Sequence, residues 1–194
     1  MDERSELPRR RGRPRSETAR RAILAAALEL AAERDAERVT MDAIARRARV
    51  SKETLYRWWR SKGEVLLEAL AQRGEEAIPV PDTGSLAGDL GRFMRSTAAA
   101  LDRPTRRLLR TLAAQAAADP AFAEQTRERF LARRRAALAA VLDRAVERGE
   151  LTAPRAGIAL DLVFGSLWYR LIFDVGPLDA SWADAVTDAI SRPT

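Results

Sequence analysis

"VTMDAIARRARVSKETLYRWWRSKGEVLLEAL", residues 39–70, decides the fold of this chain, because helix starts recur in it at short intervals. Thr40, Ser51 and Ser61 each stand before a segment of helical periodicity, where a hydroxyl can cap the first turn of a helix. Ser61 and Glu64 also form a capping-box pattern. The stretch predicts two short helices and then a longer one, with a tight turn, "ARVS", between the first two.

The middle of this stretch, residues 51–60, separates into an apolar face and a charged face when it is placed on a helix. Leu55 and Trp59 share the apolar face and are predicted to lie in the core. Their expected partners are Ile44, Ala45 and Val50, while Glu53, Arg57 and Arg60 point the opposite way and Tyr56 and Trp58 lie on the flanks. This arrangement is typical of a helix-turn-helix whose second helix enters the DNA major groove. The alternative is a three-helix packing module with a solvated charged face.

The rest of the chain continues the helical pattern and divides it into three parts. Residues 1–15 lack apolar periodicity and predict a disordered basic arm, and residues 16–62 form the helix-turn-helix domain. Residues 63–194 form a larger helical domain, interrupted by a proline-rich hinge or linker at 78–84. Further helices are expected at 86–101, 104–118, 120–148, 154–173 and 179–191. Because no run of alternating β-branched residues occurs, the sequence predicts an all-α fold.

Composition excludes most catalytic chemistry. The chain of 194 residues contains no cysteine and no histidine, so disulfides, thiolate nucleophiles, Cys/His metal sites and imidazole bases are absent. No phosphate loop or nucleophile elbow is visible either. We therefore expect a protein that is not an enzyme and that carries no cofactor or metal.

The distribution of charge indicates a polyanionic partner for one part of the chain. The net charge is +6, and residues 1–73 hold 18 Lys and Arg against 12 Asp and Glu, whereas residues 74–194 hold 16 of each. All of the excess positive charge thus lies in the predicted DNA-binding third. The longest uncharged run of the most apolar segment, residues 162–169, is too short to span a bilayer, and the N-terminus lacks the apolar stretch of a signal peptide. A cytoplasmic protein without membrane contact is expected.

Residues 39–70 closely resemble the DNA-binding region of the tetracycline-repressor (TetR) family. The matching positions are Thr40, Ile44-Ala45, Val50-Ser51, Leu55-Tyr56, Trp59, Ser61-Lys62 and Leu66-Leu67. Two positions depart from the usual pattern: Arg49 stands where the family has a turn glycine, and Trp58 stands where it often has histidine. If Arg49 adopts the left-handed conformation, an arginine there costs about 1 kcal/mol.

The resemblance implies DNA-contacting roles for residues of the helix-turn-helix. Lys52, Glu53 and Arg57 are the candidates for base contacts, and the candidates for phosphate contacts are Thr40, Ser51, Thr54, Tyr56, Trp58 and Lys62. In the arm, Arg11-Gly12-Arg13-Pro14 resembles an AT-hook, whose arginines enter a narrow minor groove. A solvated basic tail is the alternative for Arg11 and Arg13.

The resemblance also implies a C-terminal domain that forms a homodimer and binds a small-molecule effector. The candidates for the dimer interface are Leu167, Trp168, Leu171, Trp182, Val186 and Ile190, with an intrachain core as the alternative for Leu167 and Trp168. The candidates for the ligand cavity are Phe93, Leu109, Leu112, Phe130, Phe164, Trp168, Tyr169 and Arg170, although aromatic residues at helical spacing often form plain core. For Arg170, a structural ion pair and contact with an anionic ligand are both open.

The sequence therefore predicts a dimeric repressor that binds a near-palindromic operator on double-stranded DNA and is released by a small molecule. Two other classes of function remain. One is an architectural nucleic-acid-binding protein without an effector, which would show strong salt dependence and little sequence preference. The other is a helical enzyme or interaction module whose basic face binds an acidic protein.

Overall fold

The structure is a computed structural model, and it describes residues 13–34 and 36–192, with side chains from residue 17 onward. Within these ranges every regular element is helical, which confirms the all-α prediction. In chain order the elements are α1 (Arg13–Glu33), the 3₁₀ turn η1 (Ala36–Arg38), α2 (Met41–Ala48), α3 (Lys52–Tyr56), α4 (Lys62–Ala77), α5 (Leu86–Ala100), α6 (Arg103–Ala118), α7 (Pro120–Thr126), the π-helical turn η2 (Arg127–Leu131), α8 (Ala132–Glu147), α9 (Ala153–Phe173) and α10 (Ala180–Ser191).

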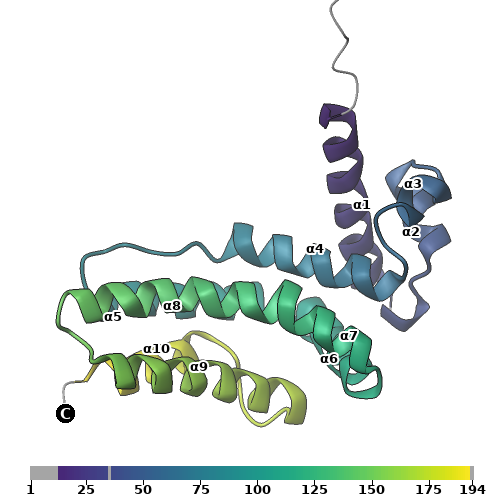
Figure 1. Cartoon of the computed structure of the whole chain (residues 1–194). Coiled ribbons are helices and arrows are strands. Elements are labelled where there is room, and N and C mark those ends of the chain that lie inside the picture. The colour runs from purple at the N-terminus through teal and green to yellow at the C-terminus, as the bar shows by residue number, and fades with distance from the viewer. Residues whose placement is uncertain (1–12, 35, 193–194) are drawn as a thin grey trace, which may run out of the picture.

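The helices form two groups. Figure 1 shows α1, α2 and α3 gathered at one end of the molecule and α5 to α10 layered at the other, with α4 running from one group to the other. We call α1, η1, α2 and α3 the head and α5 to α10 the body. Besides α4, α6 joins the two groups, because it packs against α1 and η1 and its Arg107 donates to carbonyl oxygens at the end of α1 at 3.3 Å.

The three predicted caps are all present in the head. The hydroxyls of Thr40, Ser51 and Ser61 accept hydrogen bonds from backbone N–H groups three residues ahead, at 3.1, 3.2 and 3.3 Å. The predicted capping box differs in one detail, because the Glu64 carboxylate accepts from the N–H of Arg60 at 3.1 Å instead of that of the cap itself. Local sequence thus sets the helix starts of the helix-turn-helix.

The turn between α2 and α3 is left-handed at Arg49, whose φ and ψ are 55° and 44°. The N–H of Val50 returns to the carbonyl of Ala45 at 3.0 Å, which closes the end of α2 in the manner of a Schellman motif. The sequence left open whether Arg49, which stands where the TetR family has a turn glycine, adopts this conformation, and the structure shows that it does. Arg49 and Asp174 are the non-glycine residues with positive φ in the described part of the chain.

We expect Arg49→Gly to raise the melting temperature by about 2–4 °C, because glycine adopts this conformation without the penalty of about 1 kcal/mol that a Cβ brings. Thermal unfolding followed by circular dichroism would measure the shift. Arg46→Gly is the matched control, since Arg46 is an exposed residue within α2, where glycine is destabilising. A fall in melting temperature for Arg49→Gly would contradict the left-handed assignment.

The second helix of the helix-turn-helix, α3, is shorter than predicted. We expected helical structure from residue 51 to 60, but α3 ends at Tyr56 and the chain continues as a turn. The N–H of Trp59 still reaches the carbonyl of Leu55 at 3.1 Å, so the two side chains keep their common face. Leu55 is 0% exposed and Trp59 is 1% exposed, which confirms their prediction as core residues.

The N-terminal boundary also differs from the prediction. We expected an arm over 1–15 and a helix from Ser16, whereas α1 already begins at Arg13, with Pro14 in its first turn, where a missing N–H costs nothing. Arg11 lies outside the described residues, and so does the side chain of Arg13. Their predicted minor-groove contact therefore stays a prediction.

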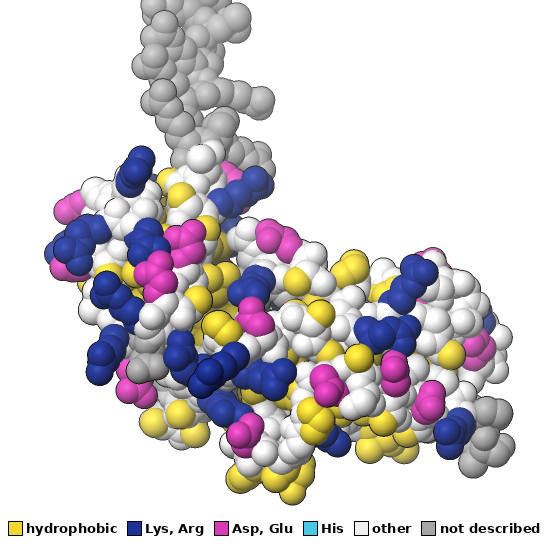
Figure 2. Space-filling view, turned by 180° about the vertical axis from the view of Figure 1, so that it is seen from behind, with side chains coloured by type: hydrophobic (Ala, Val, Ile, Leu, Met, Phe, Trp, Pro, Cys, Tyr) yellow, Lys and Arg dark blue, Asp and Glu magenta, His cyan; other side chains and the backbone are white. Residues whose placement is uncertain are grey.

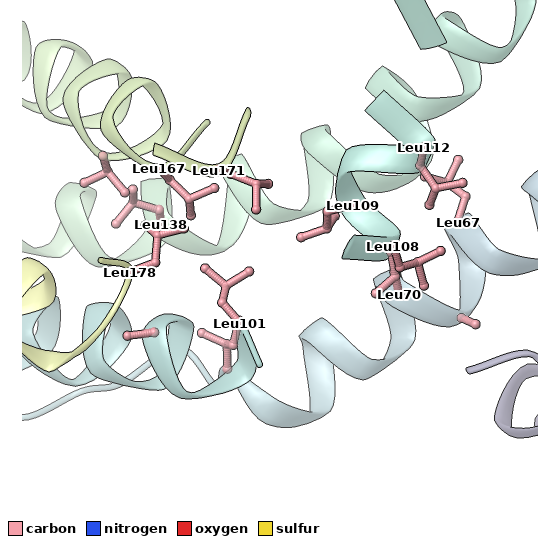
Figure 3. Packing of buried hydrophobic residues seen from close by; sticks show 14 of the residues in the cluster. Leu67, Leu70, Leu101, Leu108, Leu109, Leu112, Leu138, Leu167, Leu171 and Leu178 are labelled. Carbon is pink, nitrogen blue, oxygen red and sulfur yellow. The ribbon is translucent and has the colours of Figure 1, made fainter. Parts of the chain in front are cut away.

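A continuous apolar core links the two halves through α4. Figure 3 shows Leu67 and Leu70 of α4 lying near Leu108, Leu109 and Leu112 of α6. The same core continues to α8 and α9, where Leu138, Leu167 and Leu171 are buried. Burying this surface supplies the main favourable term for the joint between head and body.

The long helix predicted over 120–148 consists of three segments in the structure. Asp119 caps α7 by accepting from the N–H groups of Ala121 and Phe122, and five residues of π-helix then separate α7 from α8. A π turn places an extra residue in one turn and so rotates the following helix relative to the preceding one. This change of register brings Phe130 and Arg134 to the same internal space.

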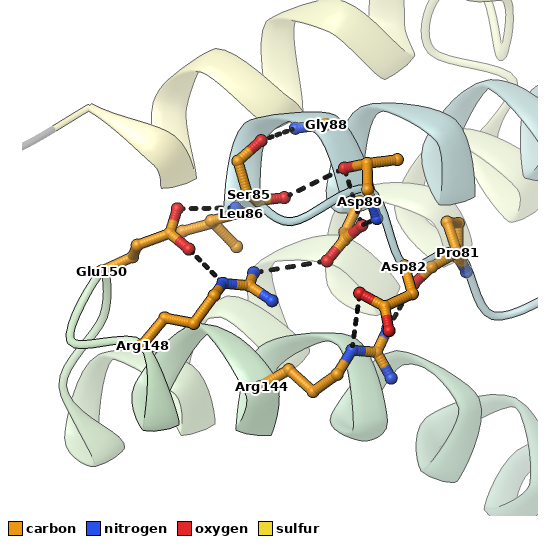
Figure 4. Close-up of polar contacts among 10 residues, drawn as sticks. Pro81, Asp82, Ser85, Leu86, Gly88, Asp89, Arg144, Arg148 and Glu150 are labelled. Atoms are coloured by element: carbon orange, nitrogen blue, oxygen red, sulfur yellow. Dashed lines mark hydrogen bonds and ion pairs between the residues drawn. The ribbon is translucent and has the colours of Figure 1, made fainter.

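The predicted hinge at 78–84 is tied to the body instead of being free. Asp89 at the start of α5 is 0% exposed; its carboxylate accepts from the Thr83 hydroxyl at 2.8 Å and from Arg148 at 3.3 Å. Glu150 bonds Arg148 and accepts from the N–H of Leu86 at 2.7 Å (Figure 4). Charged side chains from the end of α8 thus hold the linker against α5.

Candidate nucleic-acid interface and ligand cavity

The outer surface of α3 presents the residues predicted to contact DNA. Lys52, Glu53, Tyr56 and Arg57 are exposed, and Tyr56 has 52% of its surface accessible. Figure 2 shows Lys and Arg side chains distributed over the head. The five-residue length of α3 concentrates this surface in a single helical turn, which matches helix-turn-helix proteins that contact base edges with the N-terminal residues of the second helix.

The charged groups on this surface are ionised at neutral pH. Lys52 Nζ lies 2.7 Å from Asp42 Oδ2, and the hydrogen bond raises the pKa of Lys52 above its usual value. Hydrogen bonds from its own backbone N–H and from Ser51 lower the pKa of Glu53. Both partners of the Lys52–Asp42 pair are more than half exposed, so this pair is weak and open to exchange with a phosphate.

Several of the residues predicted to contact phosphates already have partners within the head. Thr40 and Ser51 are exposed, but their hydroxyls already serve as caps, and the Ser51 and Thr54 hydroxyls lie 3.1 Å apart. Trp58 is half-buried: it stacks on Trp59 with ring centroids 5.6 Å apart. The structure therefore leaves only part of the Trp58 ring available to a phosphate or a thymine methyl group.

Lys62 has an internal role that the sequence did not reveal. Its ammonium donates to the carbonyl of Ala36 at 3.3 Å and to the carbonyl of Glu37, both in η1. The lysine thereby ties the start of α4 to the segment between α1 and α2. Its predicted contact with phosphate stays a prediction.

A buried cluster that the sequence analysis missed fixes the head to α4. Trp59 Nε1 donates to Glu68 Oε2 at 2.7 Å, and Arg20 of α1 bonds the other carboxylate oxygen of Glu68. The Arg20 guanidinium also lies 5.7 Å from the centroid of the Trp58 ring. The signal in the sequence was weak, because Glu68 and Arg20 are 48 residues apart and each reads alone as a surface charge on an amphipathic helix.

The body contains a cavity of about 80 Å³ that borders α4, α5, α6, η2, α8 and α9. Five predicted ligand-binding residues line it: Phe93, Leu109, Phe130, Phe164 and Trp168. Leu112 lines an adjoining hollow that shares Leu109, Phe130 and Trp168 with the first. Four of the five predicted aromatic residues therefore surround a common internal space.

Two predicted ligand residues lie outside the cavity. Tyr169 points outward from α9, is 59% exposed and contacts the ring of Phe173. Arg170 donates to the carbonyl of Pro177 at 2.9 Å and does not line the cavity, and the structural ion pair considered for it stays a prediction. Both residues sit on the outer side of α9, which helical periodicity could not distinguish from the inner side because the helix is apolar nearly all round.

A buried cation at the cavity is Arg134 of α8, which was not predicted from the sequence. It is 8% exposed, and its Nη1 donates to the carbonyl of Gly74 in α4 at 3.1 Å. In the sequence it is one of three consecutive arginines, residues 133–135, and it is the one that α8 turns inward. Only the rotation of α8 identifies which member of such a run is buried.

The predicted dimer residues are mostly core of the single chain. Leu167, Leu171, Trp182 and Ile190 are buried within the protomer, and Trp168 and Val186 are half-buried against the same core. Burial corrects the assignment of the first four as interface residues, whereas that of Trp168 and Val186 stays a prediction. The exposed apolar side chains of α9 are instead Ile158, Leu162, Tyr169, Ile172 and Phe173.

By length and composition alone, α9 is apolar enough to cross a membrane. It carries Asp161 and Arg170, and the buried residues Val163, Leu167 and Leu171 lie on its inner side. One face packed on the body and a second apolar face outside account for its composition.

An all-helical body joined to a helix-turn-helix head is the architecture of a DNA-binding regulator. Residues 23–69 match the model of the bacterial regulatory proteins of the tetR family, and residues 80–190 match that of the tetracyclin repressor-like C-terminal domain. The chain belongs to the TetR family of transcriptional regulators, a family of regulators and not of enzymes.

Relatives and solved structures agree along nearly the whole chain. The uncharacterized HTH-type transcriptional regulator YdeS of Bacillus subtilis is 34% identical over 182 residues, which cover 93% of this chain and 92% of the relative. The DNA-binding transcriptional repressor TetR of Mycobacteroides abscessus is 33% identical over 186 residues, covering 91% and 93%. The crystal structure of the TetR family transcription regulator SCO0332 superposes with a TM-score of 0.80 at 30% identity, covering 89% of this chain and 96% of that one.

Proposed function

We propose that the protein is a cytoplasmic homodimeric repressor that binds a near-palindromic operator and leaves it when a small molecule enters the cavity of the body. The observation that carries this proposal is the double role of α4. One end of α4 is held to the head through Glu68 and Trp59, and its other half lines the cavity with Leu70, Gly74 and, just beyond it, Ile78. A ligand that binds better to one position of α4 shifts the two heads toward that arrangement.

DNA contact is assigned to the exposed surface around α3. Lys52, Glu53 and Arg57 read base edges, because they are exposed and charged, with Lys52 and Glu53 at the start of α3 and Arg57 directly after its last residue. Thr40, Ser51, Thr54, Tyr56, Trp58 and Lys62 contribute phosphate contacts, with Arg11 and Arg13 reaching the minor groove from the arm.

The exposed apolar stripe of α9 supports the assignment of a dimer. Ile158, Leu162, Tyr169 and Ile172 recur at spacings of three, four or seven residues and are 42–60% exposed. Figure 2 shows apolar side chains along the lower edge of the body, where Figure 1 places α9. A two-fold axis at this stripe would pair the same face of two copies and set two heads on successive turns of DNA.

We expect Leu162→Glu to convert the protein to a monomer, because a carboxylate on the self-complementary face would be buried without a partner. Light scattering after size exclusion would measure the mass, and operator binding should fall together with the dimer. Val80→Glu is the control, since Val80 is a similarly exposed apolar residue outside α9. A dimeric Leu162→Glu protein would place the interface elsewhere.

Selection of bound sequences from random duplex DNA at near-physiological salt tests the function directly. The proposal expects enrichment of one near-palindrome, and Arg57→Ala should relax the preference at particular base pairs while leaving the helical content intact. Arg92→Ala, an exposed arginine in α5, is the matched control. Recovery of unselected DNA that is lost on raising the salt would replace the repressor with the architectural alternative.

A further inference from the structure

We propose that the cavity binds a small apolar monocarboxylic acid, whose carboxylate pairs with Arg134. This inference rests on the proposed ligand-released regulator and names the chemical class of its ligand. Its starting point is the state of Arg134: the side chain is 8% exposed, and its Nη2 has no hydrogen-bond partner among the residues that the structure describes.

No acidic side chain in residues 17–34 and 36–192 forms an ion pair with Arg134. Glu75, whose charge acts on this arginine, forms its own ion pair with Arg133 at 3.1 Å. Burial lowers the pKa of Arg134 and Glu75 opposes this, yet a guanidinium stays protonated in proteins. The remaining contacts of Arg134 are the carbonyl of Gly74 and the face of Phe93, 5.2 Å from the guanidinium carbon to the ring centroid.

Thr105 of α6 borders the same cavity and is 8% exposed, but it is engaged with Asp102. Its backbone N–H donates to Asp102 at 2.8 Å, and its hydroxyl helps to lower the pKa of that carboxylate. Buried polar groups are almost always paired, and a buried charge without a partner is costly. A ligand carboxylate that accepts from Arg134 Nη2 would supply the partner that this atom lacks.

The charge of the cavity selects a monoanion. Arg73 also lines it, but its Nη2 lies 3.0 Å from Asp102, which neutralises that cation. One uncompensated positive charge matches one carboxylate, whereas a phosphate monoester would bring up to two negative charges. The remaining wall is apolar, with Leu109, Val163 and Trp168 among its members, so the rest of the ligand is hydrocarbon or aromatic.

Arg134 also links the ligand to the head of the molecule. Its Nη1 holds the carbonyl of Gly74, and Gly74 lies on the helix whose Glu68 accepts from Trp59. A carboxylate that draws the guanidinium toward the cavity acts directly on this contact with α4. The same side chain thus recognises the anion and transmits its presence.

The experiment is isothermal titration of the full chain with a panel of straight-chain and aromatic monocarboxylic acids, each beside its methyl ester. We expect at least one acid to bind tightly and its ester to bind at least about tenfold more weakly, because the ester lacks the charge that pairs with arginine. Arg134→Gln should weaken the best acid about 10- to 100-fold and leave the ester unchanged. Arg134→Lys should recover part of the loss, since lysine keeps the charge without the planar fork.

Arg170→Gln is the matched control, because this arginine is bonded to Pro177 outside the cavity. Equal binding of acids and esters by the wild-type chain would overturn the proposal without any variant, and so would an Arg134→Gln protein that binds the acid normally. Alkyl phosphates that outbind the acids would also overturn it. Acid binding that leaves a selected operator bound would keep the site and contradict only the release mechanism.

Discussion

Replacing Trp59 by alanine is expected to lower the free energy of unfolding by about 3–5 kcal/mol. The Trp59 ring is 1% exposed and lies between α3 and α4. Its removal would leave a large cavity that the surrounding helices cannot fill. It also removes the N–H that Glu68 accepts at 2.7 Å. Urea denaturation followed by circular dichroism would measure the loss, and binding to the selected operator should weaken in parallel.

Two further changes separate packing from hydrogen bonding at this site. Trp59→Phe keeps most of the ring and loses the N–H, so about 1–2 kcal/mol is expected. Trp58→Ala removes a half-exposed ring that stacks on Trp59, and about 1 kcal/mol is expected. A Trp59→Ala protein no less stable than Trp58→Ala would show that Trp59 is not the centre of this core.

Asp89→Asn is expected to lower the free energy of unfolding by about 2–4 kcal/mol at neutral pH. The carboxylate is fully buried and accepts from Thr83 and Arg148, and an amide in its place would turn an N–H₂ toward donors. This loss of stability is smaller than for an isolated buried ion pair, because Arg148 retains its ion pair with Glu150. Asp82→Asn is the control, since Asp82 lies 3.9 Å from Arg144 with 71% of its side chain exposed.

The stability that Asp89 provides should depend on pH in a definite direction. Burial by itself raises the pKa of Asp89, but the hydrogen bonds from Thr83 and Arg148 outweigh it and leave the pKa below its ordinary value. A group with a lowered folded-state pKa stabilises the protein above its unfolded pKa, about 3.9, and loses that effect as pH falls toward the folded value. The difference in the free energy of unfolding between wild type and Asp89→Asn should therefore be constant from about pH 5 to 7 and shrink below about pH 4. A difference that grew on acidification would contradict this origin.

The exposed side of α9 and the burial of Arg134 could not be predicted from the sequence. Periodicity identified α9 as apolar all round but could not say which side meets the protomer, so buried Leu171 and exposed Leu162 looked alike. In the same way, three consecutive arginines gave no sign that Arg134 is the inward one. Both failures come from side-chain directions that depend on how a helix is rotated against its neighbours.

Within the head, local chemistry decides most of the structure. The caps at Thr40, Ser51 and Ser61, the left-handed Arg49 and the buried pair Leu55 and Trp59 depend on contacts between residues close in the chain, so the helix-turn-helix can be predicted from its local sequence. The length of α3, the pairing of Glu68 with Trp59 and Arg20, and the inward rotation of α8 depend on atoms brought together from distant segments. These features arise only in the folded chain, because burial and pairing between segments depend on their mutual packing, which no local pattern encodes.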